Sequence, residues 1–205
     1  MITDLHADYL RELGNIGASH AATTLSTILS TMISINVPEI IVVQLQNLEN
    51  YIDDIPAAIV MFQIQGQVAG GGYMVLHIPK DSIIRLTNIM LGKATADREI
   101  DDMDKSALNE IGNIMTSSFL DACATLLSII MLPSPPSMVI DMPLAAIETI
   151  IATQEIEDQL DQVVLFKTEL KCAEHHIVAN IMLLPTKKLL TELFSRMDNL
   201  MASSG

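Results

Sequence analysis

The sequence predicts an α+β fold in which long helices pack on a largely antiparallel sheet, built from two copies of one unit. The segment at residues 12–17 returns almost unchanged at residues 110–115. In each half, apolar residues first recur at helical spacing and then give way to short Ile- and Val-rich runs that are typical of strands. A period this long that occurs only twice favours a pseudo-twofold domain over a solenoid, which needs three or more short repeats.

The repeat is much wider than this segment and divides the chain into residues of about 1–98 and 99–205. One offset, without a gap, superposes Asp8 on Ser106, Leu10 on Leu108, Glu12 on Glu110, Gly14 on Gly112, Asn15 on Asn113, Ile16 on Ile114 and Pro38 on Pro136. With a larger offset, Val60 and Phe62 match Val164 and Phe166. We therefore interpret residues 1–205 as a single domain made of two repeats.

The first half opens with a helix that Thr3 or Asp4 can cap and that runs to about Met32. Its polar side chains form one stripe, at Asp8, Glu12, Asn15 and Ser19, away from the apolar stripe. Gly14 and Gly17 each weaken this helix by about 1 kcal/mol relative to Ala, so we expect another backbone to approach closely there. The other elements expected are a strand at 33–46, a connection at 48–55, strands at 57–65 and 68–78, and a helix at 79–91.

The second half restarts after a charged linker at 93–104, with Asp104 as the expected helix cap. The polar stripe of this helix contains Ser106, Glu110, Asn113 and Ser117, and the prolines at 133, 135 and 136 are expected to end the helix. The other elements expected are a strand at 137–141, a helix at 143–154, strands at 163–172 and 175–184, and a helix from Pro185 to about Met201.

Charge and composition exclude some classes of function. The net charge is −14 from 25 acidic and 11 basic residues, so a nucleic-acid backbone would be repelled. The second half carries most of this charge, either to steer a basic partner or only for solubility. No apolar run reaches the roughly 18 residues that span a bilayer, and the N-terminus lacks a signal-peptide pattern. We therefore expect a soluble, cytoplasmic protein without membrane insertion.

The side chains that usually carry covalent or metal chemistry are not arranged for it in the sequence. No Ser, Cys or Lys is placed as a nucleophile beside a base, and no His, Cys and carboxylate cluster has metal-ligand spacing. Cys123 and Cys172 are interpreted as small buried hydrophobic residues. The doublet His175-His176 would point to opposite faces of a strand. We therefore predict no metal site and no cofactor of the chain's own.

The repeated Glu and Asn pairs are the strongest candidates for function. Glu12 with Asn15, and Glu110 with Asn113, each place a carboxylate and a carboxamide on one helical face. A carboxylate can bind a cation on a partner, and an amide can orient a water for phosphoryl transfer. The alternative is structural, with the pairs forming hydrogen bonds between the two long helices.

The spacing of these residues resembles a known family. Asp or Ser, three residues, Glu, two residues, Asn, then twenty-two residues and Pro occur at 8–38 and again at 106–136. This pattern is similar to the CheC family of chemotaxis phosphatases, whose relatives include CheX and the phosphatase part of FliY. The flagellar switch protein FliM is similar in fold but has lost the pairs, and CheX carries one. Two intact pairs therefore favour an enzyme of the CheC type.

The resemblance implies hydrolysis of the phosphoaspartate on the response regulator CheY. Asn15 and Asn113 would orient the attacking water, and Glu12 and Glu110 would engage the regulator's active-site lysine. The supporting residues would be Asp8 and Ser106 on the helix faces and Pro38 and Pro136 in the neighbouring turns. Mg²⁺ would be supplied by the regulator.

Two other hypotheses stand beside the enzyme. The chain could be a non-catalytic module that binds phosphorylated receiver domains, as a switch component does. From the resemblance alone, it could also bind the receptor deamidase CheD.

Overall fold

The fold is described here from a computed structural model, which covers residues 4–36, 39–52, 55–68, 71–95, 97–153 and 162–204. Its elements in chain order are α1 (Asp4–Leu29), β1 (Ser34–Ile35), β2 (Glu39–Gln44), the 3-10 helix η1 (Leu45–Asn50), β3 (Ala57–Gly66), β4 (Gly72–Pro79), α2 (Lys80–Leu91), α3 (Asp102–Leu127), β5 (Met131–Pro133), β6 (Ser137–Asp141), α4 (Pro143–Thr153), β7 (Gln162–Cys172), β8 (Ile177–Pro185) and α5 (Lys187–Ser204). The predicted α+β class is confirmed.

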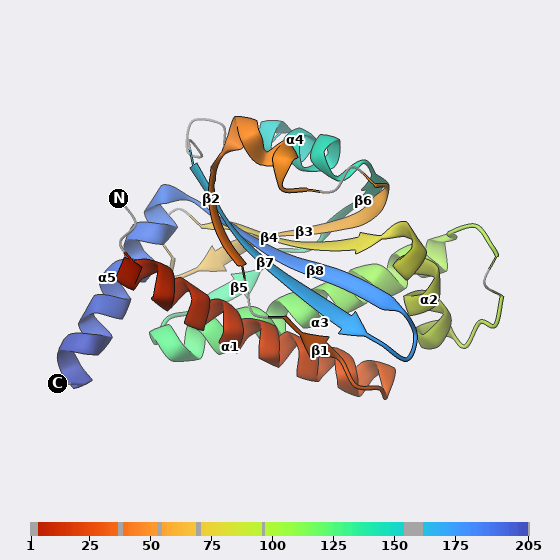
Figure 1. The fold of residues 1–205 in the computed structure, drawn as a ribbon, viewed down its shortest axis with the longest axis horizontal. Helices are drawn as coiled ribbons and strands as arrows, with labels where there is room; N and C mark the ends of the chain where they lie inside the picture. The colour runs from red at the N-terminus through yellow and green to blue at the C-terminus, as the bar shows by residue number, and fades with distance from the viewer. Residues whose placement is uncertain are drawn as a thin grey trace.

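The strands form one antiparallel sheet with the order β1-β7-β8-β4-β3-β5. The two short strands β1 and β2 both pair with β7, and β5 and β6 both pair with β3. The long helices α1 and α3 cover one face of this sheet, and η1 and α4 lie over the other (Figure 1). The sheet is therefore buried between two layers.

Strand β3 shows why its sequence is apolar at almost every position. Ala58, Val60, Phe62 and Ile64 belong to the core under α1 and α3. The alternate residues Ala57, Ile59 and Met61 belong to the second core, which includes Ile147 of α4. A strand that is covered on both faces loses the usual alternation of polar and apolar residues.

Helices α1 and α3 lie side by side and run in opposite directions (Figure 1). A Cβ added at Gly17 would lie 2.6 Å from the ring of Phe119, so glycine is required for this contact. Thr24 and Ser118 share a hydrogen bond of 2.9 Å between the helices. The predicted close approach at Gly17 thus involves the second long helix, but the partner is an aromatic side chain instead of a backbone.

Several predicted boundaries in the first half are wrong. Helix α1 ends at Leu29 instead of Met32, because Ser30 adopts a left-handed conformation with φ of 51°. The single strand expected at 33–46 is divided into β1 and β2. The strand expected at 68–78 begins only at Gly72, where an added Cβ would lie 2.8 Å from the carbonyl oxygen of Leu184.

The second long helix begins differently from the prediction. Asp101, not Asp104, is the N-cap, and the two residues form a capping box in which each carboxylate accepts the other's backbone N–H. Asp104 is completely buried and also accepts hydrogen bonds from Arg98 and Lys93. Arg98 donates in addition to Thr87 of α2, at 2.9 Å. Residues 98–104 of the expected linker therefore tie α2 to α3.

The predicted end of α3 is also wrong, since the helix stops at Leu127 and Ser128 is its left-handed C-cap. Strand β5 follows before the prolines that were expected to end the helix. His175 and His176 lie in the turn between β7 and β8 instead of in a strand. Pro185 ends β8, and α5 begins at Lys187. Among the described helices, none is both long and apolar enough to span a bilayer.

Candidate functional site

The second pair lies on the outer face of α3. Leu108, Ile111 and Met115 are buried in the core, so positions 110 and 113, on the opposite side of the helix, face away from the sheet. Glu110 and Asn113 are exposed on that outer face. Separation by three residues places them on adjacent turns of the helix.

A proline-rich segment completes a groove beside this face of α3. The groove is open, has a volume of roughly 570 Å³, and is lined by Ser106, Asn109, Glu110, Asn113, Pro133, Ser134, Pro135 and Pro136. All four residues predicted in the second half, namely Ser106, Glu110, Asn113 and Pro136, thus line the same groove. The sequence pattern alone could not show that residues about 20 apart would meet.

The wall of the groove opposite α3 is fixed to the sheet by Ser134. The backbone N–H of Ser134 donates to the carbonyl of Gln63 at 2.8 Å. Its hydroxyl accepts from the N–H of Gln63 at 2.9 Å and donates to the carbonyl of Pro135, also at 2.9 Å. The position of Pro136 relative to α3 therefore depends on β3, and the groove is a preformed feature of the fold.

Asn109 is a groove residue that the sequence reasoning missed. It places a second carboxamide beside Glu110, and its Oδ1 atom is buried without a hydrogen-bond donor among the described residues. Its counterpart in the first half is Arg11, so a search for repeated residues passes over it. The sequence could have revealed Asn109 only by its helical spacing, since it lies three residues after Ser106 and four before Asn113.

The first pair lies on α1, where Asp8 and Glu12 are exposed and Asn15 is partly buried. Arg11 donates to Asp8 at 2.5 Å, which places an exposed ion pair on the turn that carries Glu12. In the second half, Ser106 instead donates to the carbonyl of Asp102. Pro38, the remaining predicted residue, lies outside the described residues.

The two pairs belong to separate surfaces. Because α1 and α3 are antiparallel, Leu13 lies opposite Cys123, whose thiol is 3.8 Å from the Leu13 carbonyl. Asn113 is nearly three helical turns before Cys123 on α3. The pairs therefore do not form one composite site, because this register places them too far apart along the helices to contact each other.

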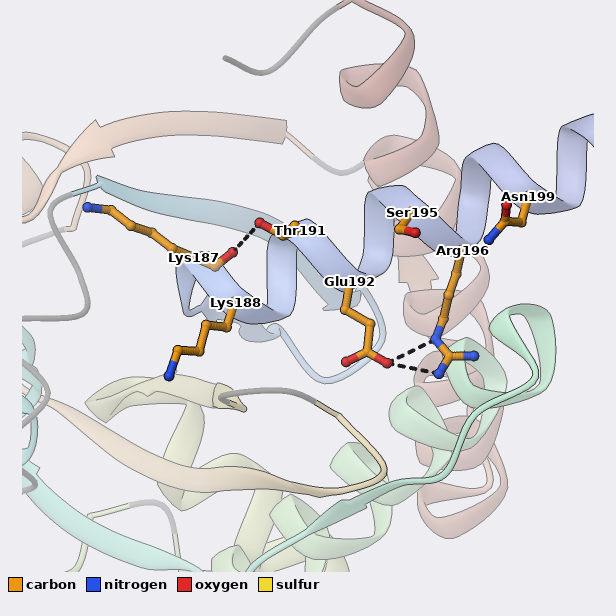
Figure 2. A pocket seen from close by; sticks show the side chains of 7 residues that line it. All are labelled: Lys187, Lys188, Thr191, Glu192, Ser195, Arg196 and Asn199. Carbon is orange, nitrogen blue, oxygen red and sulfur yellow. Dashed lines mark hydrogen bonds and ion pairs between the residues drawn. The ribbon is translucent and has the colours of Figure 1, made fainter.

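A second depression follows the exposed face of α5. It is lined by Lys187, Lys188, Thr191, Glu192, Ser195, Arg196 and Asn199. Figure 2 shows that Arg196 points toward Glu192, to which it donates at 2.8 and 3.0 Å. The residue three after Glu192 is Ser195, not Asn. This face is basic, but it lacks the carboxylate and amide pair of α1 and α3.

Other chemistry finds little support in the part of the chain that the structure describes. It contains no group of three or more His, Cys, Asp or Glu residues that could hold a metal ion. Cys123 and Cys172 are both buried and unpaired, as predicted. Burial raises the pKa of the Cys123 thiol, which keeps it protonated and unreactive. What the groove offers is a carboxylate, two amides and two hydroxyls, which can bind and position a partner.

Comparisons with known proteins show which family the chain resembles. The model of the CheC-like family matches residues 5–42 and 103–140, and these segments contain all eight predicted site residues. The "CheY-P phosphatase CheC" of Bacillus subtilis (strain 168) is 31% identical over 146 residues, which cover 69% of this chain and 69% of that protein.

Solved structures show the same fold. FliY from Thermotoga maritima matches with a TM-score of 0.74 and 22% identity, covering 97% of this chain and 98% of that one. FliM from H. pylori, in a complex with SpeE, matches with a TM-score of 0.69 and 14% identity, covering 96% and 98%.

Proposed function

The chain belongs to the CheC-like family, and from that membership we propose that it is a protein phosphatase that hydrolyses the phosphoaspartate of the chemotaxis response regulator CheY. The observation that carries the proposal is the meeting of Ser106, Glu110, Asn113 and Pro136 in one open groove. A relative described as a CheY-P phosphatase gives that groove its proposed substrate.

In the proposed reaction, the carboxamide of Asn113 orients a water in line with the bond from phosphorus to the aspartate oxygen. The water oxygen bonds to phosphorus as that bond breaks, the aspartate leaves as a carboxylate, and both protons of the water stay with the phosphate, which is released as H2PO4−. Asn15 has the same role on α1. Positioning of this kind accelerates a reaction without a covalent intermediate.

Glu110 and Glu12 would bind the active-site lysine of the regulator and hold the two proteins in register. Both carboxylates are exposed, so they are accessible to a partner. A carboxylate directed at the phosphoryl group itself would be repelled by it. Mg²⁺ held by the regulator would neutralise the phosphoryl charge, while Ser106 and Asp8 would support the helix faces.

The test is the decay of radiolabelled phosphorylated CheY with Asn15→Ala, Asn113→Ala and the double variant. Each single variant should retain the activity of the other site, and the double variant should return the decay to the unassisted rate while still binding the regulator. Ser19→Ala, an exposed change on the same face of α1, is the control. Full activity in the double variant would refute the proposed role of the amides.

A second candidate is a non-catalytic module that binds phosphorylated receivers. The shared fold with FliM favours it, because related domains occur in protein complexes. It predicts that the wild-type chain binds phosphorylated CheY without any faster loss of phosphate. The same decay assay, combined with a binding measurement, separates the two functions.

The receptor deamidase CheD is a further proposed partner, from family membership alone. Co-purification of the chain with the cognate CheD tests it, and a pull-down that shows no binding would remove CheD as a partner.

A further inference from the structure

Another depression lies beside α3, nearer to the C-terminal end of the helix than the groove at Glu110. This depression has a volume of roughly 310 Å³ and is lined by Asp121, Ala124, Thr125, Ser128, Ile129, Ile130, Met131 and Leu132. Positions 113, 117, 121, 124 and 128 follow one another at steps of four, four, three and four, which is a single face of the helix. The two depressions therefore lie along the same face of α3 and are bounded by the same stretch, residues 129–136.

Two large apolar side chains on this stretch are exposed. Ile130 and Leu132 keep 49% and 52% of their surface accessible, while Met131 between them is buried in the main core. The alternation follows from the extended backbone, which directs neighbouring side chains to opposite sides. Met131 thus anchors the strand in the core, while the fold leaves about half of each neighbouring apolar side chain uncovered.

These two side chains also lie at an edge of the sheet. Strand β5 ends the hydrogen-bonded order of the sheet, with β3 as its partner at Ile64–Gly66. Exposed apolar residues on a strand at the edge of a sheet promote association, so natural proteins usually place charged residues there. An apolar pair at such an edge, directly before the prolines of the groove, is typical of a binding surface.

The size of the proposed substrate indicates what covers this surface. A specific protein interface buries about 800 Å² on each partner, which is more than the open groove around Glu110 and Asn113 supplies. A receiver domain bound at this groove must also cover neighbouring surface. Apolar anchors surrounded by polar residues are what such an interface requires.

We propose that Ile130 and Leu132 form an apolar docking surface for the phosphorylated receiver domain that reacts at Glu110 and Asn113. This inference rests on the proposed function. In this proposal the apolar surface contributes affinity for the receiver, and the groove carries out the hydrolysis. Substitutions can therefore change the one without changing the other.

The first half has a weaker form of the same surface. The offset that relates the repeats places Met32 at the position of Ile130 and Ser34 at that of Leu132. Met32 is 84% exposed, whereas the second position is polar. The receiver is therefore expected to bind more tightly at the second pair than at the first.

The experiment isolates each site before it changes the docking surface. In an Asn15→Ala background, where only the second pair is intact, Ile130→Thr with Leu132→Gln should raise KM for phosphorylated CheY about tenfold and leave kcat within twofold. Full burial of two half-exposed side chains has roughly this effect on affinity. In an Asn113→Ala background the same double change should have no effect, while Met32→Thr should raise KM.

Ile55→Thr is the matched control, because Ile55 is 58% exposed and lies outside both depressions. Thermal unfolding of each variant verifies that the fold is kept. An unchanged KM in the active Asn15→Ala background would overturn the inference. So would a wild-type dimer that the double change dissociates while KM stays constant, because the surface would then belong to a second copy of the chain.

Failure of the proposed function has a different signature. If no variant, including the wild type, accelerates phosphate loss, then the phosphatase proposal fails. The docking surface is then tested by the Kd for phosphorylated CheY, which should still rise about tenfold with Ile130→Thr and Leu132→Gln. An unchanged Kd would reject it.

Discussion

Replacement of Asp104 by Ala should be among the most destabilising single changes in the second half of the chain. The carboxylate is completely buried and accepts hydrogen bonds from Arg98, Lys93 and the backbone N–H of Asp101. Its removal leaves the guanidinium of Arg98 at the junction of α2 and α3 without its main partner. The first turn of α3 also loses one half of its capping box.

The magnitude follows from how far the network is withdrawn from water. Removal of one partner from a fully buried pair costs about 3–5 kcal/mol. Here Arg98 is 14% exposed and Lys93 is 28% exposed, so partial hydration reduces the expected loss to about 2–4 kcal/mol. At roughly 2–4 °C for each kcal/mol in a chain of this size, Tm should fall by about 5–15 °C.

Calorimetric or circular-dichroism melting at neutral pH measures this change. Asp102→Ala is the control, because Asp102 is exposed and pairs with Lys105 on the surface. That variant should keep Tm within about 2 °C. A change of similar size in both variants would refute the special role given to Asp104.

The pH dependence gives a second readout. The hydrogen bonds from Arg98 lower the pKa of Asp104 below its unfolded value of 3.8. A carboxylate with a lowered folded pKa contributes stability that is present above the unfolded pKa and is lost as the pH falls toward the folded one. Wild type should therefore lose more stability than Asp104→Asn between about pH 5 and pH 2. Parallel curves for the two proteins would contradict this assignment.

Two further predictions concern the contact between the long helices. Gly17→Ala should destabilise the protein by about 1–3 kcal/mol in urea unfolding, because its Cβ would lie within 2.7 Å of the buried ring of Phe119. Phe119→Leu should relieve that clash, so the two substitutions together should destabilise the protein by less than the sum of their separate effects. Strictly additive effects would contradict the proposed clash. Cys123 should react with Ellman's reagent only after unfolding, because burial raises the pKa of its thiol; rapid reaction in native buffer would show that the helix pair opens.

Periodicity predicted most of the fold because long amphipathic helices and doubly covered strands leave strong local patterns. The expected strand at 137–141 matches β6 at both ends. The start of α3 was missed because Asp101, Asp102 and Asp104 are all acceptable caps by residue type. The choice among them depends on Arg98, which reaches Asp104 from another turn of the chain. No local pattern contains that contact.

The sequence likewise predicted one part of the candidate site and missed another. Helical spacing was enough to place Ser106, Glu110 and Asn113 on one face. The opposite wall depends on how β5 pairs with β3 and returns the chain beside α3. Short strands of this kind leave almost no signal, and the prolines there were therefore interpreted as the end of a helix. Asn109 was missed because a repeat reveals what two halves share, not where they differ.

Those differences decide how the two pairs should be interpreted. Around the first pair, Asp8 and Arg11 form an exposed ion pair, whereas the second has Ser106 and Asn109 in the same places. A receiver that brings a lysine and a phosphoryl group must compete with Arg11 for the acidic side chains of α1. At the position on α3 that corresponds to Arg11, Asn109 instead adds an uncharged donor and acceptor. Conservation of the pair within one chain therefore does not make the sites equivalent, and the neighbouring residues favour the second site for binding the phosphorylated partner.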